Sequence, residues 1–437
     1  MDSKALTRFQ SVLLLATIVV AAVVGSAAYI LFSGNAPAME PIIVGICDEL
    51  DGERPVWRAA VLAAEQVNAE GGVLGRNITI VAEDDDNGID TVVAIDALTR
   101  LITLDEADYI ITPNAVTIIP YQDVCSQQKK ILFSVRSAFV ELTQRVIDDY
   151  DKYRYFFRVM NPNVTALVSF YADSALTLRE YTGFNKIALL VHDSGALPDM
   201  ASGLSKILLA NGFEIVFNTE IPVATTDFSS YLARIESSGA EVLYPLLAGG
   251  QVGLSKEWYG REAPFVIWGN VGNAGDRDFY NLTQAKGEFV SFNGWPVVAG
   301  YPLTSKTVPA GEAYLERWGE NMANSQVAAA YDVVRFIIPD AIKRAGTSDV
   351  EAVIMALEQT DVETTLAQHF RFTASHDVMV SAPGPNMLRE NHVVPCMFQW
   401  QNGTQIPVYP KEMMEEAGAT YKFPRWSGPW GNRTEAP

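Results

Sequence analysis

The stretch that decides the fold lies at residues 41–85 and reads PIIVGICDELDGERPVWRAAVLAAEQVNAEGGVLGRNITIVAEDD. A short apolar run, Ile42–Ile46, is typical of a strand that is buried on both faces. Apolar residues then recur at helical spacing over Trp57–Val67, and the glycine pair at 71–72 is a helix stop. A second apolar run, Asn77–Ala82, predicts another strand. This order of strand, helix and strand predicts a parallel βαβ unit.

The same alternation continues along the chain and restarts after Arg158. Further elements are expected at Thr91–Thr103 (helix), Tyr109–Ile111 and Ile131–Ser134 (strands), Val164–Thr177 (helix), Lys186–His192 (strand), Leu204–Asn211 (helix), Glu214–Phe217 (strand), Phe228–Ser238 (helix), Val242–Tyr244 (strand) and Val327–Lys343 (helix). The tail after Val393 reads as a hairpin that turns at Asn402-Gly403. Two βα series predict an α/β fold with two Rossmann-like lobes, each built on a parallel sheet.

The N-terminal segment contains a run of 21 residues without a charge, Val12–Phe32. About 20 apolar residues cross a hydrocarbon layer as a helix. Lys4 and Arg8 precede the run, so the positive-inside rule places the N-terminus inside and the following domain outside the cell membrane. The length favours an uncleaved single-pass anchor. A cleaved signal peptide, with Ala36-Pro37-Ala38 as its cleavage site, is the competing interpretation.

Composition and cysteine usage narrow the function classes. The 437 residues carry a net charge of −20, and an acidic surface argues against nucleic acid as a partner. The three cysteines, Cys47, Cys125 and Cys396, form no C-x-x-C pair, which argues against structural zinc. Buried free thiols are favoured over a single disulfide.

Motifs of catalysis are weak. The chain contains no G-x-S-x-G and no H-E-x-x-H motif, and the neighbours His192-Asp193 and His376-Asp377 are isolated pairs. The run Asp84–Gly88 fails as a calcium loop because Ile95 occupies the position of the bidentate glutamate. We therefore expect no enzyme activity and no cofactor.

The segment Asn68–Arg76 (NAEGGVLGR), followed by a strand and Glu83-Asp84-Asp85, resembles the leucine/isoleucine/valine-binding protein family of ABC transporters. Further matches follow in order at residues 107–113 (ADYIITP), 131–134 with 141–143, 226–229 (TDFS), 331–332, 376–377, 399–403 (QWQNG) and 408–410. The resemblance covers about residues 41–426. It implies two lobes that are joined by three crossovers and close on a ligand.

The resemblance also implies a function. The chain is expected to capture an amino acid or related small polar or anionic solute outside the cell and to deliver it to ABC permease and ATPase subunits. A ligand-sensing ectodomain that works with a separate signalling partner is the alternative. The predicted division is a cytoplasmic basic stub (1–11), the anchor (12–32), a tether (33–40), lobe 1 (41–158 and 295–370), lobe 2 (159–294 and 371–426) and a surface tail (427–437).

The candidate ligand-binding residues follow from the resemblance. In the family, a serine after the third strand and a Gly-Ala-Thr segment after the fourth hold the substrate carboxylate. The positions that match here, or lie beside a match, are Asn114, Ala115, Val116, Thr117, Arg136, Ser137 and Ala138. The family's tyrosine falls at Leu197, and its acid, which pairs with the substrate ammonium, falls near Gly269, with Asn270 beside it.

These replacements predict a site with an extra arginine and without its usual acid, so an anionic solute is expected to be preferred. Asp48, Glu49 and Asp51 in the first βα loop are the candidates that could restore an ammonium site, and Trp57 and Trp268 are candidate walls of the cleft. On an external protein, five Asn-X-Ser/Thr sequons are candidate glycosylation sites. Their asparagines are Asn77, Asn163, Asn281, Asn402 and Asn432.

Overall fold

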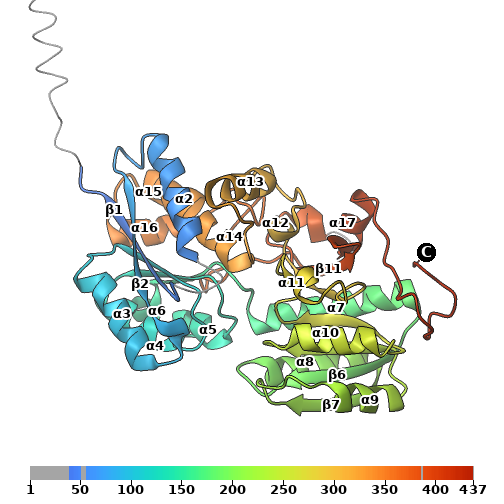
Figure 1. The fold of residues 1–437 in the computed structure, drawn as a ribbon. Coiled ribbons are helices and arrows are strands. Elements are labelled where there is room, and N and C mark those ends of the chain that lie inside the picture. The colour runs from blue at the N-terminus through green and yellow to red at the C-terminus, as the bar shows by residue number, and fades with distance from the viewer. Residues whose placement is uncertain (1–38, 51–55, 385–386, 437) are drawn as a thin grey trace, which may run out of the picture.

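The computed structural model describes residues 39–50, 56–384 and 387–436 and arranges them in two lobes (Figure 1). The predicted anchor and the stub before it, residues 1–32, lie outside the described residues, as does Asp51. Within the described part of the chain, no helix has both the length and the apolar composition that a membrane span requires.

The first lobe is built on a five-stranded parallel sheet with the order β2-β1-β3-β4-β5. Its strands are β1 (Ile42–Asp48), β2 (Ile78–Asp84), β3 (Tyr109–Thr112), β4 (Ile131–Ser134) and β5 (Phe156–Arg158). The central strands β3 and β4 are buried along their whole length, because helices cover both faces of the sheet.

The two faces of this sheet bury separate apolar clusters. One face is covered by α3 (Thr91–Thr103), α4 (Ile118–Gln128), α5 (Val140–Asp148) and α6 (Tyr150–Tyr153), with the short turn η1 (Asp86–Gly88) before α3. The other is covered by α2 (Val56–Ala69), α13 (Thr307–Trp318), α14 (Ser325–Asp332), the π-helical turn η2 (Val333–Ile337), α15 (Ile338–Ala345) and α16 (Val350–Leu357). The chain therefore returns from the second lobe to complete the core of the first.

The second lobe holds a seven-stranded sheet with the order β12-β11-β10-β9-β8-β6-β7. Its strands are β6 (Lys186–His192), β7 (Glu214–Ile221), β8 (Val242–Leu247), β9 (Val266–Val271), β10 (Ser291–Gly294), β11 (Cys396–Gln401) and β12 (Thr404–Tyr409). Its helices are α7 (Val164–Thr182), α8 (Leu197–Ala210), α9 (Ser229–Ser237), α10 (Gln251–Gly260), α11 (Phe279–Leu282) and α17 (Lys411–Glu416). Strands β11 and β12 pair antiparallel around Asn402-Gly403, so the predicted hairpin is confirmed.

Three segments connect the lobes. The first runs from β5 to α7, and the second leads from β10 into α12 (Pro296–Ala299). Phe372, Val378 and Val393 pack in the core of the first lobe, whereas Cys396 packs in the second. The third crossover therefore lies C-terminal to residue 370, where the sequence had placed the boundary. The short turn η3 (Met387–Glu390) lies near it.

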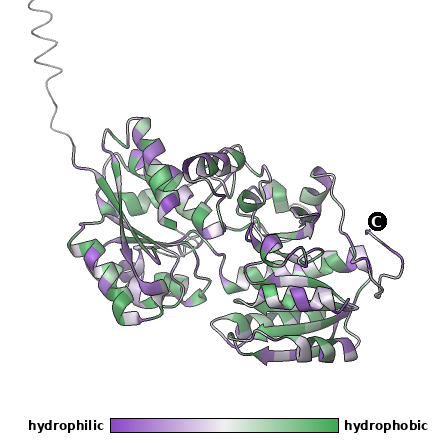
Figure 2. Cartoon of the chain, in the orientation of Figure 1, coloured by the Kyte–Doolittle hydropathy of each residue, from purple (hydrophilic) through white to green (hydrophobic). Residues whose placement is uncertain are grey.

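The predicted α/β fold with parallel sheets is confirmed by these topologies. The three cysteines are buried with free thiols. The tail is not merely a surface segment, because Trp430 is 2% exposed and stacks on Phe423 at 6.0 Å between ring centroids. Figure 2 shows that the apolar residues gather along the strands and on the inner sides of the helices.

Candidate functional site

A cavity of about 210 Å³ is lined by residues of both lobes and of two crossovers. The first lobe contributes Arg136, two residues after β4, and the cap and first residues of α14. The second lobe contributes the carboxyl ends of β8, β9 and β10. Open parallel sheets bind ligands at the carboxyl ends of their strands, so the cavity lies where the topology places a ligand.

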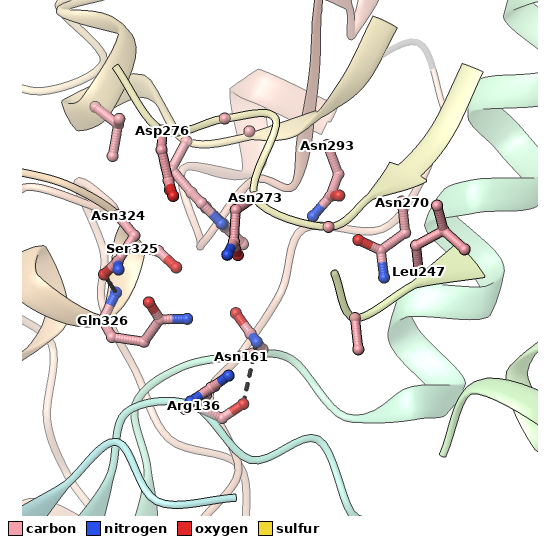
Figure 3. A pocket seen from close by; sticks show the side chains of 16 residues that line it. Arg136, Asn161, Leu247, Asn270, Asn273, Asp276, Asn293, Asn324, Ser325 and Gln326 are labelled. Atoms are coloured by element: carbon pink, nitrogen blue, oxygen red, sulfur yellow. Dashed lines mark hydrogen bonds between the residues drawn. The ribbon is translucent and has the colours of Figure 1, made fainter. Parts of the chain in front are cut away.

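The start of α14 projects polar groups into this cavity. Asn324 caps the helix, because its Oδ1 accepts from the backbone N–H groups of Gln326 (3.1 Å) and Val327 (3.2 Å). The cap fixes the first turn, and the carboxamide of Gln326 extends toward the centre of the cavity (Figure 3).

The loop that carries Arg136 is held both by the end of its own sheet and by the first crossover. The four successive carbonyl oxygens of residues 136–139 accept, in order, from Asn161 Nδ2, the Arg158 guanidinium, the backbone N–H of Val164 and again the Arg158 guanidinium. Val164 begins α7 of the second lobe. The loop is thereby a bridge between the lobes at the edge of the cavity.

Two ionisable residues line the cavity, Arg136 and Asp276. Their side chains enter it from opposite sides in Figure 3. Asp276 is 9% exposed and follows β9. Gly269, where the resemblance places the family's acid, has no side chain, and Asp276, farther along the same segment, is an acid that lines this cavity.

Of the other candidates from the sequence, Asn270 lines the cavity, beside Gly269 at the end of β9. Gly269 cannot carry a side chain, because a Cβ would lie 2.7 Å from Tyr244 Cδ1. Trp268 is fully buried and donates from Nε1 to Ser174 Oγ (3.1 Å), so it belongs to the core and does not wall the cavity.

The candidates after β3 do not line the cavity. Asn114 Nδ2 donates to Asp85 Oδ2 (3.1 Å) and to Thr117 Oγ1 (2.6 Å). Its Oδ1 accepts from the backbone N–H groups of Val116 and Thr117. Asn114 therefore fixes the backbone of this loop, while Ala115 is half-buried and Val116 is 67% exposed.

Asp48 lies at the end of β1 and caps the beginning of α2. Its Oδ2 accepts from the backbone N–H of Val56 and its Oδ1 from that of Glu49, both at 2.9 Å. Burial raises the pKa of Asp48 to about 7. Trp57 packs edge-on against Trp318 at 5.8 Å between ring centroids. Neither Asp48 nor Trp57 lines the cavity.

The remaining candidates have structural surroundings. Ser137 is buried and Ala138 packs against the core of the second lobe. Leu197 is the first residue of α8, where it packs partly buried on the same core and does not line the cavity. Among the described residues, no group of histidine, cysteine, aspartate and glutamate side chains forms a metal site.

The sequons differ in exposure. Asn77, Asn281, Asn402 and Asn432 are exposed. Asn163 is less accessible to glycosylation, because its side chain is already engaged. Its Oδ1 accepts from the backbone N–H of Ala166 and so caps α7, and its Nδ2 donates to Asp377 Oδ2 at 2.7 Å. A glycan on this amide would break the contact with Asp377.

A family model described as "Periplasmic binding protein" matches residues 51–383. The chain belongs to this family. A protein of Brucella suis named "Leu/Ile/Val-binding protein homolog 7" is 23% identical over 397 residues, which cover 87% of this chain and 94% of the relative. The resemblance to the leucine/isoleucine/valine-binding proteins is thereby confirmed.

Solved structures share the fold. The branched-chain amino acid transporter substrate binding protein LivJ from Streptococcus pneumoniae, in complex with isoleucine, matches with a TM-score of 0.66, 19% identity and coverage of 84% of this chain and 99% of that one. An ABC transporter solute binding protein from R. palustris, in complex with benzoate, also reaches 0.66, with 16% identity and coverage of 84% and 95%. The family is one of extracytoplasmic solute-binding proteins, which are not enzymes.

Proposed function

We propose that this periplasmic binding protein captures an amino acid or a related small polar or anionic solute between its lobes and delivers it to an ABC permease with its ATPase subunits. The observation that carries the proposal is the cavity that both lobes line, with Arg136 and Asp276 entering from opposite sides. Its volume of about 210 Å³ suits a small solute, since drug-sized ligands occupy ~300–1,000 Å³.

The charges of the cavity fit a zwitterion. A guanidinium offers a planar fork of N–H donors that matches a carboxylate, so Arg136 is the proposed partner of the solute's carboxylate. A desolvated ammonium requires an anion or several acceptors, and Asp276 is the proposed partner of an amino group. A carboxylate solute without an amino group would engage Arg136 alone.

Calorimetry on the full chain in detergent tests this assignment. A panel of amino acids and small carboxylates is titrated into the wild type, Arg136→Ala and Asp276→Asn, with Arg261→Ala as the control for loss of an exposed arginine. A charge-assisted hydrogen bond contributes roughly 1.5–3 kcal/mol, so Arg136→Ala should weaken binding about 10- to 100-fold. If both cavity variants bind the best solute as tightly as the wild type does, the solute does not bind in this cavity.

We also propose that residues 12–32 anchor the domain in the cell membrane, with the N-terminus inside. The support is the uncharged run of 21 residues after Lys4 and Arg8. Protease added to intact cells should digest the domain, which should otherwise remain with the membrane fraction. Release of the domain into the medium with Met39 at its N-terminus would show instead that the segment is a cleaved signal peptide.

Delivery to a transporter is tested by uptake of the radiolabelled solute in cells. Cells that lack the chain should lose uptake, and the wild-type chain should restore it while Arg136→Ala should not. A solute that binds tightly but is taken up equally well without the chain would refute the role in transport and leave the binding role intact.

A further inference from the structure

The cavity gathers carboxamide side chains whose hydrogen-bonding groups are unused. Asn270, Asn273, Asn293 and Gln326 all line it, and the side chains of these four make no hydrogen bond to any described residue. The Oδ1 atom of Asn293 is moreover shielded from solvent. The four amides come from β9, the segment after it, β10 and α14, so distant parts of the sequence converge with the same chemistry (Figure 3).

In the described part of the chain, every buried carboxamide side chain keeps at least one hydrogen bond to the protein, although Oε1 of Gln122 and of Gln405 accepts none; these side chains are Asn114, Gln122, Gln399, Gln401 and Gln405. Gln399 Nε2, for example, donates to the carbonyl oxygens of Phe289 and Lys422. Buried polar groups are normally hydrogen-bonded, because an unpaired one pays its desolvation cost without return. Amides that lack protein partners around one cavity are therefore available to a ligand.

The apolar residues of the same cavity offer little surface. Leu247 is 1% exposed, Val298 is 3% exposed and Trp295 is 8% exposed, so their side chains are committed to the cores of the lobes. The four amides are only half-buried, so a solute in the cavity meets more of their surface than of these three apolar side chains. An aliphatic side chain in this cavity would desolvate the amides and return no hydrogen bond to them.

We propose that the solute carries an uncharged substituent that both donates and accepts hydrogen bonds, as a carboxamide does, and that Asn270, Asn273, Asn293 and Gln326 recognise it. This inference rests on the proposed function and defines the substrate class of the same site. It separates this chain from relatives whose names refer to leucine, isoleucine and valine. A site built to hydrogen-bond a polar group rejects an analogue that lacks this group far more strongly than an apolar pocket discriminates by size.

L-asparagine and L-leucine are the matched probes, because their side chains have nearly the same shape and differ in an amide against two methyl groups. Calorimetry on the full chain in detergent should show L-asparagine, or the longer L-glutamine, binding about 10- to 100-fold more tightly than L-leucine, since the unmade hydrogen bonds leave desolvated amides behind. Asn273→Leu should reduce this preference about 10-fold, as one amide is lost. The control, Asn281→Leu, changes an exposed asparagine on α11 and should leave the preference unchanged.

Leucine, isoleucine or valine binding as tightly as the amide amino acids, in an Arg136-dependent manner, would overturn the inference and leave the proposed function standing. A preference for asparagine that Asn273→Leu, Asn270→Leu and Gln326→Leu all fail to reduce would also overturn it. If no probe binds, aliphatic or polar, the proposed capture of amino acids fails, and the inference fails with it.

Discussion

A buried ion pair of the first lobe joins the end of β5 to Asp377, and breaking it should be costly. Arg158 Nε lies 2.9 Å from Asp377 Oδ1, with side-chain exposures of 0% and 5%. Burial lowers the pKa of Arg158 and raises the pKa of Asp377, while their attraction opposes both shifts. We predict that Asp377→Asn lowers the free energy of unfolding by about 3–5 kcal/mol, the usual cost of leaving one partner of a buried pair uncompensated.

The other contacts of Arg158 and Asp377 support this large predicted loss of stability. The other donors of the Arg158 guanidinium bind the carbonyl oxygens of Ser137 and Phe139, which accept hydrogen bonds but do not neutralise the charge. Asp377 also accepts from Asn163 Nδ2 at 2.7 Å. An asparagine at 377 has one carbonyl oxygen and cannot face both Arg158 and Asn163, so one of these contacts is lost along with the charge.

Urea unfolding followed by tryptophan fluorescence measures the effect. The matched control is Glu65→Gln, because Glu65 binds Arg317 with two contacts of 2.9 Å but both side chains are more than 40% exposed. Exposed pairs contribute about 0–1 kcal/mol. The double variant Arg158→Met, Asp377→Asn should be more stable than Asp377→Asn alone. A cost below about 1 kcal/mol for Asp377→Asn, similar to that of the control, would refute the reasoning.

Three further predictions concern stability and reactivity. Burial raises the pKa of Asp48 to about 7, above its unfolded value of about 3.9, so its contribution to the free energy of unfolding falls as pH rises between these values; Asp48→Asn should remove this part of the pH dependence of Tm. Gly269→Ala should cost about 1–3 kcal/mol by overpacking against Tyr244, whereas Gly260→Ala, in α10 with no atom near the new methyl, should be neutral or stabilise by up to about 1 kcal/mol in the same denaturation assay. The three buried thiols should react with iodoacetamide only in urea, and labelling of the folded protein would contradict their burial.

Much of the fold could be predicted from the sequence, because buried parallel strands are apolar runs. The bounds of α3, β4 and β6 agree with the prediction to the residue. Strand β7 was predicted to end at Phe217 and continues to Ile221, since an edge strand needs no continuous apolar run. The predicted start of α8, at Leu204, was wrong: the helix begins at Leu197, and its first turn contains Pro198 and Asp199, which are typical of helix starts.

The sequence predicted only those residues of the candidate site that lie at or near the end of a predicted strand. Arg136 lies two residues after β4 and Asn270 lies near the end of β9, and both line the cavity. Asp276 and Asn293 could not be predicted because neither lies in a stretch that resembles the family: Asp276 is in the loop after β9 and Asn293 is on β10. Gln326 was missed because α14 joins the site only through the return of the chain to the first lobe. The helix cap at Asn324 was the one local signal that marked this region.

The hydrogen bonds of the Arg136 loop bear on how the cavity would close. Lobe closure rotates the chain at the crossovers. Arg136 follows β4, and the carbonyl oxygens of residues 136–139 are held from both sides of the first crossover. Arg158, the last residue of β5 in the same sheet, holds two of them, Asn161 in the crossover holds one, and Val164, the first residue of α7, holds one. Arg158 in turn binds Asp377. The loop is therefore tied both to its own sheet and to the start of α7, so closure at the first crossover should change the contacts of the backbone that carries Arg136. Loss of the Arg158–Asp377 pair should loosen two of these contacts and accordingly weaken solute binding as well as folding.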